Sequence, residues 1–188
     1  MKKYLLILGL SVLVAGIYSS CKKDPLEAMR ENELAMLSKY VADNNFASFK
    51  DDSTAIYFKK LVTNPDATAK QIASGYKVQI FLNITLIDST QTYLTTEDKD
   101  GRNYEPIAFY VDVNNATVNQ NYVQQIAGLH VGLKKMKVGE KAFMIIPSEL
   151  AFKALDYSYD LGIPRFSTLL VTVTTVNAWS PEEQKDDL

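Results

Sequence analysis

The sequence predicts an α+β protein with a mainly antiparallel sheet, and three observations lead to this fold class. Several segments after residue 55 alternate apolar and polar residues, which is the period of a strand with one buried face. Helical patterns occur only near the N-terminus and over residues 122–135. Strands and helices therefore do not alternate along the chain, as they do in a parallel sheet.

The first twenty residues have the pattern of an export signal. Lys2 and Lys3 are followed by an apolar run over residues 4–18 and by two serines in front of Cys21. The run is shorter than the roughly 20 residues that a bilayer-spanning helix needs. Its length and its positive flank are instead typical of the apolar part of a signal peptide.

This order of positive charge, apolar run, small residues and cysteine resembles a bacterial lipoprotein signal. Tyr18 departs from it, because that position usually holds an aliphatic residue. The resemblance implies a signal peptide over residues 1–20, cleavage before Cys21 and a lipid on the Cys21 thiol. We then expect a lipid anchor in the Gram-negative cell envelope, in the outer membrane, on its periplasmic or surface face. The alternative is a buried core cysteine behind an uncleaved anchor.

Residues 21–45 are expected to form the lipidated N-terminus and a linker helix. Asp24 is placed to cap the helix, Pro25 suits its first position, and Glu27 completes a capping box. The Asp-Asn-Asn run at residues 43–45 can end it. Because its apolar stripe is loose, we expect the helix to serve mainly as a spacer between the lipid and the domain.

The remaining elements follow from the two-residue period. Residues 76–87 alternate most regularly, and residues 168–176 are rich in β-branched side chains. A second helix is expected over residues 122–135, and a polar tail over residues 180–188 should fray. The predicted strands cover residues 55–62, 76–87, 107–113, 141–146 and 168–176, and the predicted long loops cover residues 88–106 and 152–167.

Composition excludes several classes of function. One cysteine and one histidine in 188 residues cannot form an internal disulfide or a Cys/His zinc site. A nucleophilic triad could use only His130, which we expect to be a surface residue with no catalytic role. A net charge of −2 gives no support to nucleic-acid binding. We expect neither a metal nor a cofactor.

Three motifs lie at a distinctive spacing. The longest, GLHVGLKKMKVGEKAFMIIPSELAF, covers residues 128–152. Tyr-Glu-Pro-Ile-Ala-Phe precedes it at residues 104–109, and Ile163-Pro164 follows it, ahead of Thr-Leu-Leu-Val at residues 168–171. The positions of the longest motif that carry the comparison below are Gly128, Gly132, Leu133, Met136, Gly139, Glu140, Pro147, Glu149, Leu150 and Ala151.

These motifs make residues 46–179 resemble an FKBP-type peptidyl-prolyl cis–trans isomerase domain. The resemblance implies a twisted antiparallel sheet wrapped around a short helix, with a ligand groove between them and an N-terminal helix in front. It also implies isomerisation of X-Pro peptide bonds, a reaction that needs no cofactor. The expected partners are X-Pro-containing polypeptides or an unidentified protein.

The resemblance also assigns the groove, and here the chain departs from the family pattern. Leu129 replaces the tryptophan that floors the pocket, Leu94 replaces its carboxylate, and Phe152 lacks the phenolic hydroxyl of a tyrosine. The resemblance therefore implies a weakened isomerase, with a non-catalytic peptide- or protein-binding lipoprotein as the alternative. The groove candidates are Leu82, Tyr93, Leu94, Ile107, Gln125, Ile126, Leu129, Phe152, Ile163 and Val171.

Overall fold

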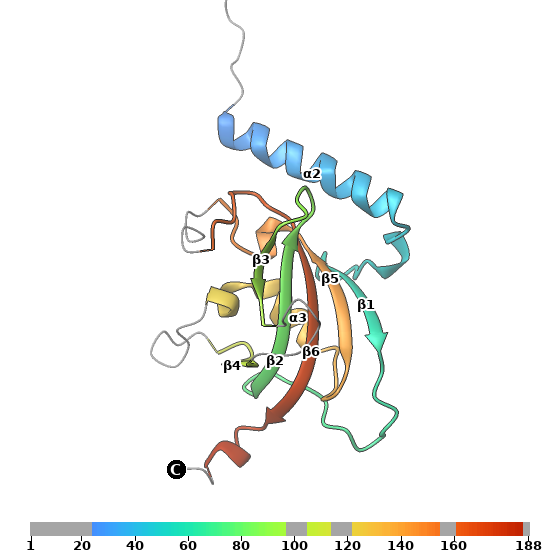
Figure 1. Cartoon of the computed structure of the whole chain (residues 1–188), viewed down its shortest axis with the longest axis vertical. Helices are drawn as coiled ribbons and strands as arrows, with labels where there is room; N and C mark the ends of the chain where they lie inside the picture. Colours follow the sequence, from blue (N-terminus) through green and yellow to red (C-terminus); the bar gives the residue numbers. More distant parts are fainter. Residues whose placement is uncertain (1–23, 97–104, 114–121, 155–160, 186–188) are drawn as a thin grey trace, which may run out of the picture.

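A twisted six-stranded antiparallel sheet curves around one short helix, and a longer N-terminal helix lies across one end of the sheet (Figure 1). The computed structural model describes residues 24–96, 105–113, 122–154 and 161–185. Cys21, the predicted signal peptide and residues 114–121 of the segment before the second helix lie outside the described residues. Within the described part of the chain, no helix is long and apolar enough to cross a bilayer.

The sheet confirms the α+β class and the antiparallel pairing. Its hydrogen-bonded order is β1-β5-β6-β2-β3, and β4 also pairs with β2. The pairs of β2 with β3, β4 and β6, and of β5 with β1 and β6, are all antiparallel. The strands are β1 (Tyr57–Val62), β2 (Lys77–Leu86), β3 (Thr92–Thr95), β4 (Ile107–Tyr110), β5 (Lys141–Ile146) and β6 (Leu169–Trp179).

Strand β2 pairs with three other strands, and its burial follows the predicted alternation. Every second residue is buried along its whole length. On the side of β2 away from β6, two short strands divide the pairing: β4 pairs with residues 77–80 and β3 pairs with residues 83–85. Strand β3 lies inside the segment predicted as a long loop. Four residues with polar neighbours are too few to show a period, so the loop prediction over residues 88–106 is wrong there.

The second helix is shorter than predicted. A single turn, η2 (Tyr122–Gln125), comes first, and α3 (Ala127–Leu133) follows after Ile126. A Cβ added to Gly128 would overlap Ile146, and one added to Gly132 would overlap Met144. The two glycines therefore let the backbone of α3 lie against β5, where larger residues would hold it away.

Helix α2 (Pro25–Asp43) begins as predicted, because the Asp24 carboxylate accepts a hydrogen bond from the Leu26 amide at 3.0 Å. It does not extend as a free spacer, however. Leu37 and Val41 are buried against Ile145 of β5, on the face of the sheet opposite α3. The helix is thus packed on the domain, through contacts that its weak apolar stripe did not predict.

Three single turns complete the described chain: η1 (Ala47–Phe49), η3 (Ser148–Leu150) and η5 (Glu183–Lys185). The start of the C-terminal tail does not fray as expected. Glu183 forms an ion pair with Lys70 at 2.5 Å, and the Ser180 amide donates to the Glu183 carboxylate. Residues 186–188 lie outside the described residues.

Candidate functional site

The groove candidates come together where the sheet meets α3. Nine of the ten belong to or pack against one apolar cluster, and only Gln125 does not. Strand register explains part of this gathering, because Leu94 of β3 lies opposite Ile84 of β2, which lies opposite Val171 of β6. Side chains in one such row share a face of the sheet. Residues far apart in sequence thus form one continuous apolar surface.

The candidates differ in how much of them a ligand can reach. Leu82, Ile126, Leu129 and Val171 have 0% of their surface exposed. Tyr93, Leu94 and Ile107 are half-buried and pack on the edge of the same cluster. The first group is part of the packed interior, and the second group adds apolar surface that stays partly accessible at the edge of the cluster.

Leu129 is one of the residues through which α3 contributes to the apolar cluster. Its position on α3 faces the sheet, and the close approach allowed by Gly128 and Gly132 seals its side chain inside the core. The residue that replaces the expected tryptophan is therefore a core residue in this structure. An open aromatic platform for a proline ring is absent at this position.

Phe152 and Ile163 are held by two loops that are bonded to each other. The turn η3 leads into Phe152, and the Lys153 amide closes it by donating to the Ser148 carbonyl at 2.8 Å. The Phe166 amide donates to the Lys153 carbonyl at 2.9 Å and so joins the loop that carries Ile163. Both candidates are buried. Sequence reasoning placed them in one long loop without predicting this connection.

Gln125 lies apart from the cluster, exposed at the end of η2. It borders a separate open hollow of about 500 Å³ between the end of β4 and the start of α3. The hollow is lined by Asp112, Val113, Gln124, Gln125, Ala127, His130 and Val131.

His130 beside this hollow is buried, so the expected surface position is wrong. Its Nδ1 accepts a hydrogen bond from the Asp112 amide at 3.0 Å, and its Nε2 lies 2.7 Å from the Gln124 carbonyl and so carries the proton. Phe109 packs edge-on against the ring. Burial lowers the pKa of His130 below its ordinary value. The residue joins β4, η2 and α3 as a neutral structural link.

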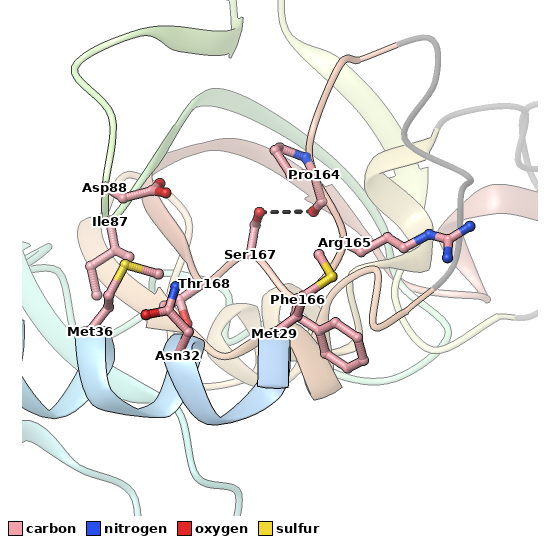
Figure 2. Close-up of a pocket in the computed structure, with 10 residues that line it drawn as sticks. All are labelled: Met29, Asn32, Met36, Ile87, Asp88, Pro164, Arg165, Phe166, Ser167 and Thr168. Atoms are coloured by element: carbon pink, nitrogen blue, oxygen red, sulfur yellow. Dashed lines mark hydrogen bonds between the residues drawn. The ribbon is translucent and has the colours of Figure 1, made fainter. Parts of the chain in front are cut away.

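A second hollow lies between α2 and the loop before β6, and sequence analysis did not predict it. Its volume is about 170 Å³. Figure 2 shows Met29, Asn32 and Met36 of α2 facing the loop. The other lining residues are Ile87, Asp88, Pro164, Arg165, Phe166, Ser167 and Thr168. The hollow exists only because α2 docks, and the sequence gives no signal for that.

The chemistry of the cluster is almost entirely apolar. Among the ten candidates only Tyr93 has an ionisable side chain. Within the described residues, no group of three His, Cys, Asp or Glu side chains is placed to hold a metal ion. Such a surface can bind apolar side chains and exclude water, and it suits a reaction that transfers no proton.

The fold resembles those of solved structures, one of which is a peptidyl-prolyl cis–trans isomerase. A peptidyl-prolyl cis–trans isomerase from Pseudomonas syringae superposes with a TM-score of 0.59 at 20% identity, over 84% of this chain and 98% of the other. FkpA from Escherichia coli superposes with a TM-score of 0.61 at 22% identity, over 93% of this chain and 72% of the other. These similarities establish the fold.

Sequence comparison identifies the family. No curated protein matches the chain. The model of the FKBP-type peptidyl-prolyl cis-trans isomerase family matches residues 68–176, which is more than half of the chain. That segment runs from the approach to β2 into β6, and it contains every groove candidate. The chain therefore belongs to the FKBP-type peptidyl-prolyl cis-trans isomerase family.

Proposed function

We propose that the protein is a membrane-anchored FKBP-type prolyl isomerase or folding helper that acts weakly on X-Pro peptide bonds. One observation carries the proposal: candidates from β2, β3, β4, α3 and β6 form a single apolar cluster within the segment that matches the family. Family membership supports an isomerase or folding helper that acts on proline-containing peptides. The anchoring and the reduced activity are the further steps that this proposal adds.

The mechanism needs no nucleophile. Rotation of an X-Pro bond passes through a twisted amide, against a barrier of about 18–20 kcal/mol. The twisted amide has lost resonance, so an apolar surface stabilises it relative to the planar ground state. Catalysis then rests on stronger binding of the twisted state, helped by donors that hold the carbonyl. Tyr93, Leu94 and Ile107 supply the accessible apolar surface for this binding.

Reduced activity follows from the groups that the groove lacks. Leu94 provides no carboxylate, and Phe152 provides no phenolic donor. A neutral hydrogen bond contributes about 0.5–1.5 kcal/mol, and about 1.4 kcal/mol of transition-state stabilisation changes a rate tenfold. Loss of both groups therefore removes much of the acceleration and leaves the part that comes from the apolar surface.

A protease-coupled assay tests the catalytic part. The full chain, purified in mild detergent, is mixed with a succinyl-Ala-Leu-Pro-Phe-p-nitroanilide peptide, and cis-to-trans conversion is followed by cleavage of the trans form. A first-order rate that rises in proportion to protein concentration supports an isomerase. A rate equal to that of the peptide alone, at high protein concentration, excludes one.

A non-catalytic peptide-binding lipoprotein is the second candidate. The observation that favours it is the sealed position of Leu129, which leaves no flat aromatic platform for a proline ring. Titration of the same peptide, followed by amide chemical shifts, separates the two functions. Saturable shifts at β3 and β4 without rate enhancement indicate a binding module, whereas shifts together with enhancement indicate an enzyme.

The proposed lipid anchor rests on the sequence alone. A thiol-linked lipid on Cys21 would hold the protein in the cell envelope, on the periplasmic or surface side of the outer membrane. Cys21→Ala removes the acylated thiol and should move the protein from the membrane fraction. Continued sedimentation of Cys21→Ala with membranes would contradict the lipid anchor.

A further inference from the structure

The carboxylate of Glu33 is almost completely buried between α2 and the domain, with 1% of the residue exposed. Four donors surround it. The Ser148 amide donates to Oε1 at 2.7 Å and the Thr168 hydroxyl donates to Oε1 at 2.8 Å, while the Ser148 hydroxyl and Arg30 Nη1 each donate to Oε2 at 2.6 Å. Amide and guanidinium groups can only donate, so the site is built to hold an acceptor.

The first partner lies at the start of η3. The opening amides of a helical turn lack internal acceptors. Pro147 occupies the capping position, and a proline side chain cannot accept a hydrogen bond. Glu33 therefore caps η3 from another helix, 115 residues away in sequence.

The second partner lies in the other loop of the candidate groove. Thr168 directly precedes β6 and ends the loop that carries Ile163. Figure 2 shows Thr168 beside the part of α2 that carries Asn32 and Met36. One carboxylate thus binds both the turn that leads to Phe152 and the loop that leads from Ile163.

Both loops have backbone conformations that need support. Lys153 and Phe166 have φ values of 56° and 52°, which residues other than glycine seldom adopt and which cost free energy. These residues are also the ones whose backbones join the loops, since the Phe166 amide donates to the Lys153 carbonyl. Lys153 and Phe166 lie between Ser148 and Thr168 along the chain, and Ser148 and Thr168 are the loop residues that donate hydrogen bonds to Glu33.

Docking of α2 alone does not explain a buried carboxylate. Leu37 and Val41 already pack against Ile145. Buried ionic clusters can often be replaced by apolar residues without loss of stability, whereas their hydrogen bonds fix orientation. The directional contacts of Glu33 therefore indicate a role in placing the loops.

We propose that Glu33 is a positioning residue for the peptide groove, and that α2 acts through it to hold in place the loop segments that carry Phe152 and Ile163. This inference rests on the function proposed above. If the loops adopt the binding geometry only one tenth of the time without Glu33, the apparent Kd for a prolyl peptide rises about tenfold.

The test compares three variants of the full chain. Glu33→Ala removes the acceptor. Glu33→Gln keeps an oxygen for the Ser148 amide and the Thr168 hydroxyl, and its amide can donate to the Ser148 hydroxyl. It loses only the acceptor for Arg30, which is not part of either loop. Leu37→Ala is the matched control, because it weakens α2 docking and leaves the carboxylate in place. The measurements are thermal stability, affinity and isomerase kinetics with the Ala-Leu-Pro-Phe peptide, and hydrogen exchange of the Lys153 and Phe166 amides.

Positioning predicts a specific pattern. Glu33→Ala weakens peptide affinity about tenfold and speeds exchange of both amides more than exchange within the β2–β6 pair, which follows only the change in global stability. Glu33→Gln recovers most of the affinity, and Leu37→Ala loses stability with affinity retained. The proposal is overturned if Glu33→Ala and Leu37→Ala lose stability alike while affinity and loop exchange match the wild type.

Failure of the proposed function gives a different result. A wild-type chain that neither binds nor isomerises the peptide removes the groove function. Exchange of the Lys153 and Phe166 amides still decides the role of Glu33 in that case. Faster exchange of these two amides in Glu33→Ala, but not in Leu37→Ala, supports loop positioning by Glu33. Exchange in Glu33→Ala that matches the wild type rejects it.

Discussion

Two helices pack on opposite faces of the same sheet, and they do so by different means. Helix α3 is short and lies against β5 through glycines and apolar side chains, among them Leu129 and Leu133. Helix α2 has a small apolar contact and a buried carboxylate with four donors. Apolar packing is non-directional and fills space, whereas hydrogen bonds to a buried carboxylate define positions. The α3 side should therefore respond to changes in volume, and the α2 side to loss of single polar atoms.

The largest effect is expected at the carboxylate. Glu33→Leu leaves the Ser148 amide and the Thr168 hydroxyl buried without their acceptor. Breaking a buried ionic cluster by removing one member costs about 3–5 kcal/mol, and the lower end applies because Arg30 is partly exposed. Urea unfolding measures the change. The exposed pair of Lys39 with Asp43 on the same helix provides the control, since Lys39→Ala should cost no more than about 0.5 kcal/mol.

The next effect is expected where α3 touches β5. Gly128→Ala forces its Cβ into Ile146, with Ile56 and Leu150 also close, whereas Gly132→Ala meets only the flexible end of Met144. Overpacking costs about 1–3 kcal/mol, and we expect Gly128→Ala near the upper value and Gly132→Ala near the lower. Thermal unfolding of both variants measures the difference. Equal losses would show that backbone approach does not limit the α3 contact.

Activity provides the third test, on the α3 side. Leu94→Asp with Phe152→Tyr restores a carboxylate and a phenol at the positions where the family pattern has them. The pair should raise kcat/KM for the X-Pro peptide about tenfold, since one hydrogen bond contributes about that much. Leu129→Trp should fail to help, because Leu129 is sealed in the core and a larger side chain has no room. An active Leu129→Trp variant would show that α3 can move away from the sheet.

The smallest effect is a pH dependence from His130. Burial lowers the pKa of this histidine in the folded protein, so protonation favours the unfolded chain. Its contribution is fully present above the unfolded pKa of about 6.5 and is lost as pH falls towards the folded pKa. Asp112 and Lys134 are charged groups close to His130, and both are kept in the His130→Gln variant used for comparison.

His130→Gln, neutral throughout this range, is the comparison. Wild type should lose more free energy of unfolding than His130→Gln when the pH is lowered from about 7.5 to about 5.5. Chemical denaturation at both pH values measures this difference. Parallel losses in the two proteins would show that His130 does not titrate in this range.

Several elements could be predicted because their signals are local. Alternation over residues 76–87 predicted β2 to within one residue at each end, and Asp24 was predicted to cap α2. The motif over residues 128–152 implied the family that the family model then identified. Each of these signals depends on neighbouring residues, whose spacing is fixed by the geometry of one element.

Other features could not be predicted because they depend on partners distant in sequence. Strand β3 is too short to show a period and forms against the edge of β2. His130 is buried because β4 and η2 supply partners for both ring nitrogens. No local pattern marks Glu33 for burial, because its donors on Ser148 and Thr168 lie in distant parts of the chain.

The sequence by itself determined the α+β class, the family and the apolar character of the groove candidates, because periodicity and motif spacing record local geometry. Only the tertiary structure decided that Leu129 is a core residue and that α2 belongs to the folded domain. It also decided that Glu33 binds two loops that lie more than 100 residues farther along the chain. A buried carboxylate becomes favourable only where folding brings its donors together. The local sequence around Glu33 does not show which distant residues will supply those donors.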